Sequence, residues 1–301
     1  MLYKHEKVGI IIVNYNGLKD TIECINSIKK IKYKNYEIIV VDNNSTDNSQ
    51  YYLKKIFSDD ITLILNNENL GFSGANNVGI KYALDMNCEY ILLLNNDTEV
   101  EEYFLNRMIE CSINNNNSIV SPKIYYYKEY NTIWSAGGDI DWKKGVTYHY
   151  GVDKIDKGQY DVERQINFAT GCCMLINKDT INKVGYLSEE YFLYYEDTDY
   201  CIKARSKGIN IMYTPKANIW HKVSSSTGGA YSPLTLYYST RNRLYFNDKY
   251  NQKNIISKLY FFATRIIRII KWLIKREYSN VYATILGLKD YNKNIMGKRE
   301  I

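Results

Sequence analysis

Oxygen-bearing side chains suited to a divalent metal ion occur together in the segment "YILLLNNDTEV". Asn95 and Asp97 are two residues apart, so in an extended segment their side chains point the same way. Hard oxygen ligands of this kind hold Mg²⁺ or Mn²⁺ through one or two contacts and leave positions for phosphate oxygens. The competing interpretation is a helix cap, because Asp97 or Thr98 precedes a Glu-rich first turn. The segment therefore predicts either a metal site or the start of a helix.

Two later segments could move a proton or complete a metal site. Glu196 and Asp197 follow the aromatic run "EEYFLYY", and a carboxylate beside aromatic walls is suited to act as a general base. Acids in a first helical turn are also favoured by the helix dipole, so capping is the alternative. His221 follows the predicted strand "NIW" and precedes the Ser- and Gly-rich segment "KVSSSTGG". This position suits a metal ligand, and an ordinary surface or core histidine is the alternative.

Polar residues suited to a nucleotide follow other apolar runs. Asp42 ends the run "IIVVD", where an acid can accept hydrogen bonds from a base or from a ribose hydroxyl. The turn "NLGFSG" contains Gly71, which permits a close approach of the backbone to a ligand. Turns of this kind are common, so the segment alone predicts only a turn.

These segments are placed by an alternation of predicted strands and helices. Strands are predicted at 8–13, 37–41, 61–65 and 90–94, and helices at 18–31, 49–57 and 74–86. A further helix follows residue 98, with Val100, Phe104, Leu105, Met108 and Ile109 on its apolar face. Such alternation predicts an α/β fold with a mostly parallel sheet flanked by helices. The polar clusters at 14–17, 42–47 and 95–98 then converge at the carboxyl edge of that sheet.

The second half of the chain is less regular. Turn residues among aromatic side chains predict hairpins or an extended loop over 123–165. Strands are predicted at 168–176, 209–214 and 217–221, and helices at 179–184 and 197–206.

Residues 257–276 form the clearest single helix of the sequence. Arg265, Arg268, Lys271 and Lys275 share one face, and apolar residues with a Trp cover the rest. This pattern is typical of a helix lying in a membrane interface. The alternative is a helix docked on the catalytic domain, with its basic stripe in water. No apolar stretch is long enough to predict a transmembrane helix.

Composition limits the remaining classes of function. The chain has 301 residues and a net charge of +6, without a helix-turn-helix, zinc-finger or RNA-binding signature, so no nucleic-acid partner is predicted. Its 6 cysteines form no CxxC pair and no zinc spacing, which predicts reduced thiols in a cytoplasmic protein. The N-terminus shows no signal-peptide cleavage pattern. The expected location is the cytoplasm, with contact to the inner face of the cell membrane if the basic helix lies in the interface.

The order of the motifs resembles the family-2 inverting glycosyltransferases of the GT-A fold, most closely their rhamnosyltransferase-like bacterial branch. The similarity spans about residues 8–246. It rests on the segments "IIIVNYNG", "IIVVDNNSTDNS", "NENLGFSGANNVGI", "YILLLNNDTEV", "FATGCCMLINKDTINKVGYLSEEYFLYYEDTDYCIKARSKG", "IWHKVSSSTGG" and "YYSTRNRLYF". The resemblance implies a catalytic domain over 1–246, with a nucleotide-binding half (1–120) and an acceptor-binding half (121–246). Residues 247–301 would form a C-terminal helical extension that contains the basic amphipathic helix.

The resemblance also implies a role for each matching residue. The nucleotide and diphosphate would be bound by Asn14, Tyr15, Asn16, Asp42, Asn44, Gly71, Asn76 and Asn96. Asp97 and His221 would bind the metal, and Asp197, paired with Glu196, would deprotonate the acceptor hydroxyl. Arg241 and Arg243 would contact diphosphate or an anionic acceptor. Asn95 stands where the family's metal motif has an Asp, so any metal contact there brings no charge.

The predicted function is transfer of rhamnose or another hexose from a UDP- or dTDP-sugar to a hydroxyl of a glycan or lipid-linked acceptor. The reaction would proceed with inversion, need Mg²⁺ or Mn²⁺, and serve surface polysaccharide synthesis. One alternative is nucleotidyl transfer, which relies on a glycine-rich phosphate loop that "NYNGLKD" lacks. Another is a non-catalytic, membrane-associated protein that binds nucleotide sugars. The presence of Asp97, Asp197 and His221 argues against that loss of activity.

Overall fold

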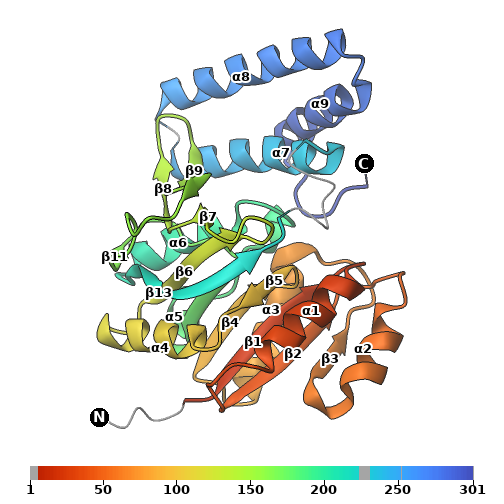
Figure 1. Ribbon diagram of the computed structural model, residues 1–301. Helices are drawn as coiled ribbons and strands as arrows, with labels where there is room; N and C mark the ends of the chain where they lie inside the picture. Colours follow the sequence, from red (N-terminus) through yellow and green to blue (C-terminus); the bar gives the residue numbers. More distant parts are fainter. Residues whose placement is uncertain (1–5, 224–230, 252, 301) are drawn as a thin grey trace.

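The first part of the chain alternates strand and helix and forms a parallel sheet (Figure 1). The computed structural model describes residues 6–223, 231–251 and 253–300. Its first strands are β1 (Val8–Asn14), β2 (Tyr36–Asp42), β3 (Thr62–Leu65) and β4 (Tyr90–Asn95), and its first helices are α1 (Leu18–Ile28), α2 (Ser49–Phe57) and α3 (Gly71–Asp85). β1 pairs in parallel with β2 and β4, and β2 pairs in parallel with β3. The predicted alternation is confirmed, although α3 begins at Gly71 and not at residue 74.

Antiparallel strands from the second half extend this sheet beyond β4. They include β6 (Ile119–Tyr126), β7 (Thr132–Ser135), β10 (Lys154–Ile155) and β12 (Cys173–Asn177). The sheet order is β10-β7-β6-β12-β4-β1-β2-β3. A hairpin of β8 (Gly138–Asp141) and β9 (Val146–His149) stands apart from it. Hairpins within 123–165 were predicted and are present.

The strands that lie beside β6 differ from those that the sequence predicted. The predicted pair of strands at 209–214 and 217–221 is one strand, β13 (Ile211–His221), with an irregularity in its register between Thr214 and Asn218. It pairs with β6, with β11 (Arg164–Gln165) and with β5 (Thr98–Val100). Val100 therefore belongs to a strand and not to helix α4 (Phe104–Asn114). Its buried side chain joins the same core cluster as Phe104, which explains why it fits the helical pattern.

Side chains that alternate along the central strands fill two separate cores. Ile10 and Ile12 of β1 pack with residues of α1, α2 and α4 on one face. Ile11 packs on the other face with residues of α3, α5 (Lys178–Val184) and α6 (Glu196–Ser206). Strands buried on both faces need apolar residues at consecutive positions, which is why these runs are recognisable in the sequence. The strand predicted at 168–176 begins only at Cys173.

Three helices, α7 (Pro233–Tyr250), α8 (Ile255–Ile274) and α9 (Tyr278–Asn292), form a layer beyond the sheet (Figure 1). The predicted C-terminal helical extension is confirmed, although the sequence defined the bounds of only one of these helices, α8. The predicted domain boundary at residue 246 falls inside α7. Within the described ranges, no helix is long and apolar enough to cross a membrane.

Helix α8 contacts the rest of the molecule through a narrow stripe of side chains. The buried members of this stripe are Ser257, Phe261, Arg265 and Trp272. The predicted basic stripe is therefore divided, because Arg265 is buried while Arg268, Lys271 and Lys275 are exposed. Most of the large apolar side chains of α8 face outward, namely Ile255, Ile256, Leu259, Phe262, Ile266, Ile267, Ile270, Leu273 and Ile274.

The guanidinium group of Arg241 links α7 to two other segments of the chain, around Tyr191 and around Gly297. The side chain is fully buried in α7. Its Nη2 donates to the carbonyl of Tyr191 at 3.1 Å, and its Nη1 donates to the carbonyl of Gly297 at 2.8 Å. Nη1 also lies 3.3 Å from the hydroxyl of Tyr237, which donates to Asp290 Oδ2 at 2.7 Å.

Replacing Arg241 by Met should lower the free energy of unfolding by roughly 3 kcal/mol, because it removes the charged donor that joins the carbonyls of Tyr191 and Gly297. Urea denaturation followed by circular dichroism would measure the change. Arg205→Met, at an exposed position of α6, is the matched control and should shift stability by less than about 0.5 kcal/mol. Equal stabilities of the two variants would contradict this role of Arg241.

Candidate active site

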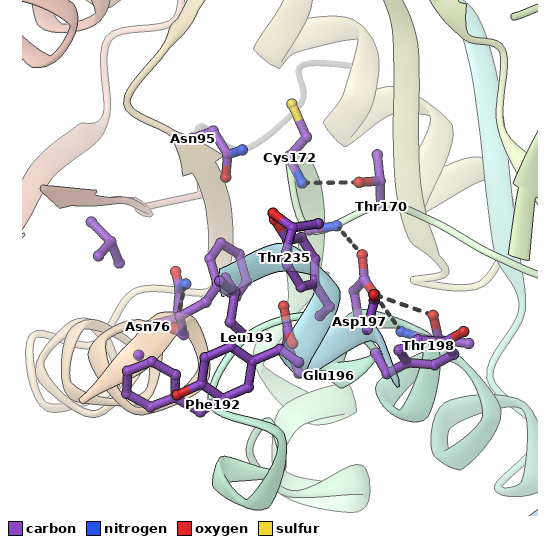
Figure 2. A pocket seen from close by; sticks show the side chains of 18 of the residues that line it. Asn76, Asn95, Thr170, Cys172, Phe192, Leu193, Glu196, Asp197, Thr198 and Thr235 are labelled. Atoms are coloured by element: carbon purple, nitrogen blue, oxygen red, sulfur yellow. Dashed lines mark hydrogen bonds between the residues drawn. The ribbon is translucent and has the colours of Figure 1, made fainter. Parts of the chain in front are cut away.

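The carboxyl ends of β1, β2 and β4 open onto one large cavity of about 770 Å³. Its size is in the usual range for small-molecule sites. Polar and acidic residues from both halves of the chain line it: Tyr15, Asn43, Gly71, Asn76, Asn95, Asn96, Asp97, Cys172, Glu196, Asp197 and His221. Figure 2 shows Asn95 and Asn76 on one side of this space and Glu196 and Asp197 near its other side. The loops that follow these strands were predicted to meet at one site, and residues from all three of them line this cavity.

Asp97 and His221 come together because two short strands pair. In the ladder between β5 and β13, His221 lies opposite Thr98, the residue after Asp97. The Nε2 atom of His221 lies 3.1 Å from Oδ1 of Asp97. Both side chains are buried. Residues more than a hundred positions apart in the sequence therefore form one acid–imidazole pair at the cavity wall.

The charge state of His221 depends on its two neighbours. Burial alone would lower its pKa, but the adjacent Cys172 and Asp97 together raise the pKa of His221 to about 10. Burial also raises the pKa of the Cys172 thiol. The Nδ1 atom of His221 is buried without a hydrogen-bond partner among the described residues.

The donor set of this pair fits a divalent cation that is shared with a substrate. The described ranges contain no group of three or more His, Cys, Asp or Glu side chains arranged for a metal ion. Asp97 and His221 supply two candidate ligands, and the Asn95 side chain lies in the same cavity. Sites for Mg²⁺ and related ions often have this few protein ligands, because substrate phosphates complete the coordination.

Asp197 is held by donors from two elements. Its Oδ2 accepts from the backbone N–H of Gly171 at 3.0 Å, and its Oδ1 accepts from the backbone N–H of Thr198 at 2.7 Å (Figure 2). Burial raises the pKa of Asp197 above its usual value, while these hydrogen bonds oppose the rise. Such a carboxylate is fixed in position and more basic than one in water, which suits proton abstraction.

Glu196 beside it is the more strongly perturbed acid. Burial and the charge of Asp197 raise the pKa of Glu196 well above its usual range. Its Oε2 has no hydrogen-bond partner among the described residues. The preceding residues Phe192, Tyr194 and Tyr195 all have positive φ angles. Strained backbone of this kind is often found at functional sites.

The predicted nucleotide residues of the first strands fall into two groups. Asn14 donates through Nδ2 to Asp42 Oδ2 at 2.7 Å, and both side chains are fully buried. Asp42 Oδ1 accepts from the backbone N–H of Ser45 at 3.0 Å. Neither residue lines the cavity, whereas Tyr15 does. The buried pair joins the ends of β1 and β2 at the base of the site.

Asn16 and Asn44 also lie away from the cavity lining. Asn16 accepts through Oδ1 from the backbone N–H of Thr46 at 2.7 Å, which ties the loop after β1 to the loop after β2. Asn44 is exposed and has a positive φ angle of 65°.

Asn43, which the sequence analysis missed, is the residue of that segment that lines the cavity. Its Oδ1 accepts from the backbone N–H of Leu70 at 3.0 Å, and its Nδ2 donates to the carbonyl of Gly71 at 3.2 Å. The available signal was its place in "DNNSTD", directly after Asp42. Gly71 is required here, because its φ is +72° and an added Cβ would lie 2.3 Å from the carbonyl oxygen of Phe192.

The predicted asparagines of α3 and of the metal segment lie at the cavity. Asn76 donates to the carbonyl of Phe72 at 2.9 Å, and Asn96 donates to Thr21 Oγ1 at 3.0 Å. Both residues line the cavity, as does Asn95.

Arg241 and Arg243 do not line the cavity. Arg241 is committed to the buried network around α7. The Nη2 atom of Arg243 donates to the carbonyl of Lys144 at 2.6 Å. We therefore leave both arginines out of the donor site.

Several residues that line the cavity were not predicted from the sequence. Trp134 lies against both His221 and His149, with ring centroids 4.7 Å apart in each pair. Burial lowers the pKa of His149 to about 4, so this side chain is neutral at physiological pH. Lys298 and Arg299, from the last residues of the sequence, also line the cavity. They are held there because Gly297 donates to the carbonyl of Glu190 at 2.8 Å.

Comparison with known proteins gives a consistent result. The model of the family described as "Glycosyl transferase family 2" matches residues 9–185. The hexosyltransferase Agl10 of low-salt glycan biosynthesis in Haloferax volcanii is 27% identical over 300 residues, which cover 98% of this chain and 94% of that protein. The dTDP-rhamnosyl transferase RfbF of Shigella flexneri is 23% identical over 299 residues, which cover 95% of this chain and 96% of that protein.

Solved structures share the fold at lower identity. GalNAc-T7 with UDP, GalNAc and Mn²⁺ superposes with a TM-score of 0.65 at 16% identity, covering 96% of this chain and 57% of that one. TarS of S. aureus superposes with a TM-score of 0.55 at 16% identity, covering 84% of this chain and 42% of that one. The present chain thus spans about half the length of these structures, and the likeness to them concerns the fold.

Proposed function

This chain belongs to glycosyl transferase family 2, and on that premise we propose that it transfers a hexosyl residue from a nucleotide sugar to a glycan hydroxyl with inversion. Its relatives support a role in glycan synthesis. The observation that carries the proposal is one cavity with a metal-type pair, Asp97 and His221, and a buried carboxylate, Asp197. Nucleotidyl transfer and a binding-only role are not favoured by these comparisons.

In the proposed reaction, Asp197 accepts the proton of the acceptor hydroxyl while that oxygen attacks the anomeric carbon. The new bond forms as the bond from the anomeric carbon to the diphosphate oxygen breaks, so a single displacement inverts the configuration. The N–H groups of Gly171 and Thr198 fix the carboxylate for this transfer. Holding the base and the reacting carbon in one cavity removes much of the entropic cost of the encounter.

The diphosphate leaving group would lie beside Asp97 and His221. A bound Mg²⁺ or Mn²⁺ would neutralise the charge that develops on it. A metal ion can bind Nε2 of His221 only when that nitrogen is deprotonated. The hydrogen bond between Nε2 of His221 and Oδ1 of Asp97 needs that proton, so a metal ion bound to both atoms would take the proton's place.

For the donor we propose a UDP- or dTDP-sugar, with rhamnose or another hexose as the transferred group. RfbF is described as a dTDP-rhamnosyl transferase and Agl10 as a hexosyltransferase. The nucleoside would lie near Tyr15 and Asn43, at the ends of β1 and β2. Within this proposal, residues 1–120 form the nucleotide-binding half, 121–246 the acceptor-binding half and 247–301 the helical extension.

Calorimetric titration with UDP, dTDP and GDP, each with and without Mn²⁺, tests the proposed function. We expect UDP or dTDP to bind, and Mn²⁺ to raise the affinity because the nucleotide diphosphate completes its coordination. Absence of binding by all three nucleotides to well-folded protein would contradict the proposal. Metal-independent binding would contradict the role of Asp97 and His221.

We also propose that α8 contacts the surface of an anionic membrane in the cytoplasm, where a lipid-linked acceptor would be available. Its outward apolar side chains lie beside the exposed Arg268, Lys271 and Lys275. Interfacial helices combine these two features.

Vesicle co-sedimentation should show stronger binding to phosphatidylcholine vesicles that contain phosphatidylglycerol than to pure phosphatidylcholine vesicles, because each basic residue near an anionic surface contributes about 1 kcal/mol. The double variant Ile266→Ser/Ile270→Ser should bind less. Ile113→Ser, at an exposed position of α4, is the control. Equal sedimentation with both vesicle types would rule out the anionic preference.

A further inference from the structure

Three arginines form a cluster between α7 and α8, outside the donor site. Arg243 extends from α7, and Arg265 and Arg268 extend from α8. Arg243 is 7% exposed and Arg265 is 4% exposed. Their guanidinium carbons lie 5.1 Å and 5.3 Å from the ring centroid of Phe261. Two buried cations therefore share one aromatic ring.

The N–H donors of this arginine cluster are only partly satisfied. Nε and Nη1 of Arg265 and Nε of Arg243 are buried without hydrogen-bond partners among the described residues. Burial, followed by the charges of Arg268 and Arg243, lowers the pKa of Arg265 to about 10. Asp141 acts on Arg243 only weakly, and it is paired with Lys144 at 3.2 Å.

Buried charges in proteins are normally paired, because an unpaired one loses its hydration without compensation. In the part of the chain that the structure describes, none of the three arginines forms an ion pair with an acid. Guanidinium groups present several donors that match the oxygens of phosphate groups. An anion at this position would therefore satisfy both the charge and the free N–H donors.

The cluster adjoins the catalytic cavity through Tyr195. This residue lines the cavity and directly precedes Glu196 and Asp197. The ring of Tyr195 packs against Phe246 of α7, with ring centroids 5.2 Å apart. The charges that act on its hydroxyl include those of Arg243, Arg265 and Asp197. Tyr195 therefore connects the arginine cluster with the segment that carries the proposed base.

We propose that Arg243, Arg265 and Arg268 bind the phosphate or diphosphate group of an amphiphilic acceptor, whose apolar chain lies along the outward face of α8. The inference rests on the proposed function and specifies its acceptor. The phosphate on the arginines would place an attached sugar near Asp197. The apolar chain would follow exposed side chains next to Arg265 on the helix surface, such as Phe262 and Ile266, which are 47% and 57% exposed. Burial of such side chains against a hydrocarbon chain is favourable.

The test uses farnesyl diphosphate, inorganic pyrophosphate and farnesol as probes, titrated into the full chain in the presence of saturating UDP and Mn²⁺. We expect farnesyl diphosphate to bind more tightly than either of the other two. Arg265→Gln should weaken this binding roughly 10- to 100-fold, since a charged hydrogen bond is lost. Arg265→Lys, which keeps the charge, should recover part of the affinity. Lys54→Gln, at an exposed position of α2, should bind like the unaltered protein.

Several results would overturn the inference. Displacement of farnesyl diphosphate by UDP would assign the anion site to the donor, and equal affinity for pyrophosphate would remove the lipid from the proposal. Equal binding by Arg265→Gln and the unaltered protein would remove the arginine cluster. Arg268→Gln, at an exposed position, gives the same test if Arg265→Gln does not fold. UDP binding without farnesyl diphosphate binding would reject only this inference, whereas loss of UDP binding would reject the proposed function.

Discussion

Replacing Asp197 by Asn should lower kcat by about 10²- to 10⁴-fold, the usual contribution of a general base. The amide oxygen can accept from only one of the two backbone N–H groups, of Gly171 or of Thr198, that the carboxylate satisfies with its two oxygens, so circular dichroism should accompany the assay to show that the variant is folded. The amide cannot take the proton of the acceptor hydroxyl. Steady-state transfer assays, together with calorimetric titration of UDP, would measure the two effects separately.

UDP affinity should be unchanged in this variant, because in the proposed reaction Asp197 contacts the acceptor and not the nucleotide. Asp85→Asn, at an exposed position of α3, is the matched control and should keep full activity. If UDP affinity and kcat fell by the same factor, Asp197 would be a donor-binding residue and not the base.

If Asp197 is the base, its pKa determines how the activity depends on pH. Because burial raises the pKa of Asp197, activity should fall as the pH drops through a value above the ordinary aspartate pKa of about 3.9. The base is ionised above that pKa and protonated below it. Glu196 has the more strongly raised pKa, so it takes up a proton first as the pH falls. Glu196→Gln imitates that protonated state and should leave the acid limb of the kcat profile in place.

Replacing Asp97 by Asn should lower kcat/KM by roughly 10²- to 10³-fold, comparable to the loss of one preorganised group that stabilises developing charge. The substitution removes the only carboxylate of the metal-type pair and leaves His221 without its anionic neighbour. The gain in UDP affinity produced by Mn²⁺ should also disappear, and titrations with and without the metal would measure that gain directly.

Asp179→Asn, at an exposed position of α5, provides the control for this experiment. Its metal-dependent UDP binding should equal that of the unaltered protein. Chelation with EDTA should reduce the unaltered protein to the activity of the Asp97 variant. An Asp97→Asn protein that keeps metal-dependent binding would show that the metal is held elsewhere.

The parts of the fold that the sequence predicts well are those with simple burial patterns. Strands β1, β2 and β4 are covered on both faces, so consecutive apolar residues reveal them. Helix α7 escaped prediction because it buries polar residues such as Arg241, Asn242 and Asn247, which removes the apolar period. Helix α8 was recognised from its pattern, but its exposed apolar residues and buried Arg265 invert the usual relation between polarity and burial.

The candidate site shows the same division. Residue type and place after a strand or at the start of a helix made Asp97, Asp197 and His221 candidates, and the resemblance in the order of motifs gave them their predicted roles. In an extended strand, successive side chains point to opposite sides, which would tell which of Asp42, Asn43 and Asn44 faces the cavity. The turn after β2 breaks this alternation, and Asn43 was therefore missed. The arginine cluster depends on how α7 and α8 lie relative to each other, which no local pattern specifies.

The wall formed by Lys298 and Arg299 has a consequence for the order of events during protein synthesis. Domains fold from their N-terminal parts while the chain is being made, so the sheet and the metal-type pair can form early. The wall cannot, because it is held by contacts such as the hydrogen bond from Arg241 to the carbonyl of Gly297. The nascent chain therefore completes the lining of the cavity only after residue 299 has left the ribosome.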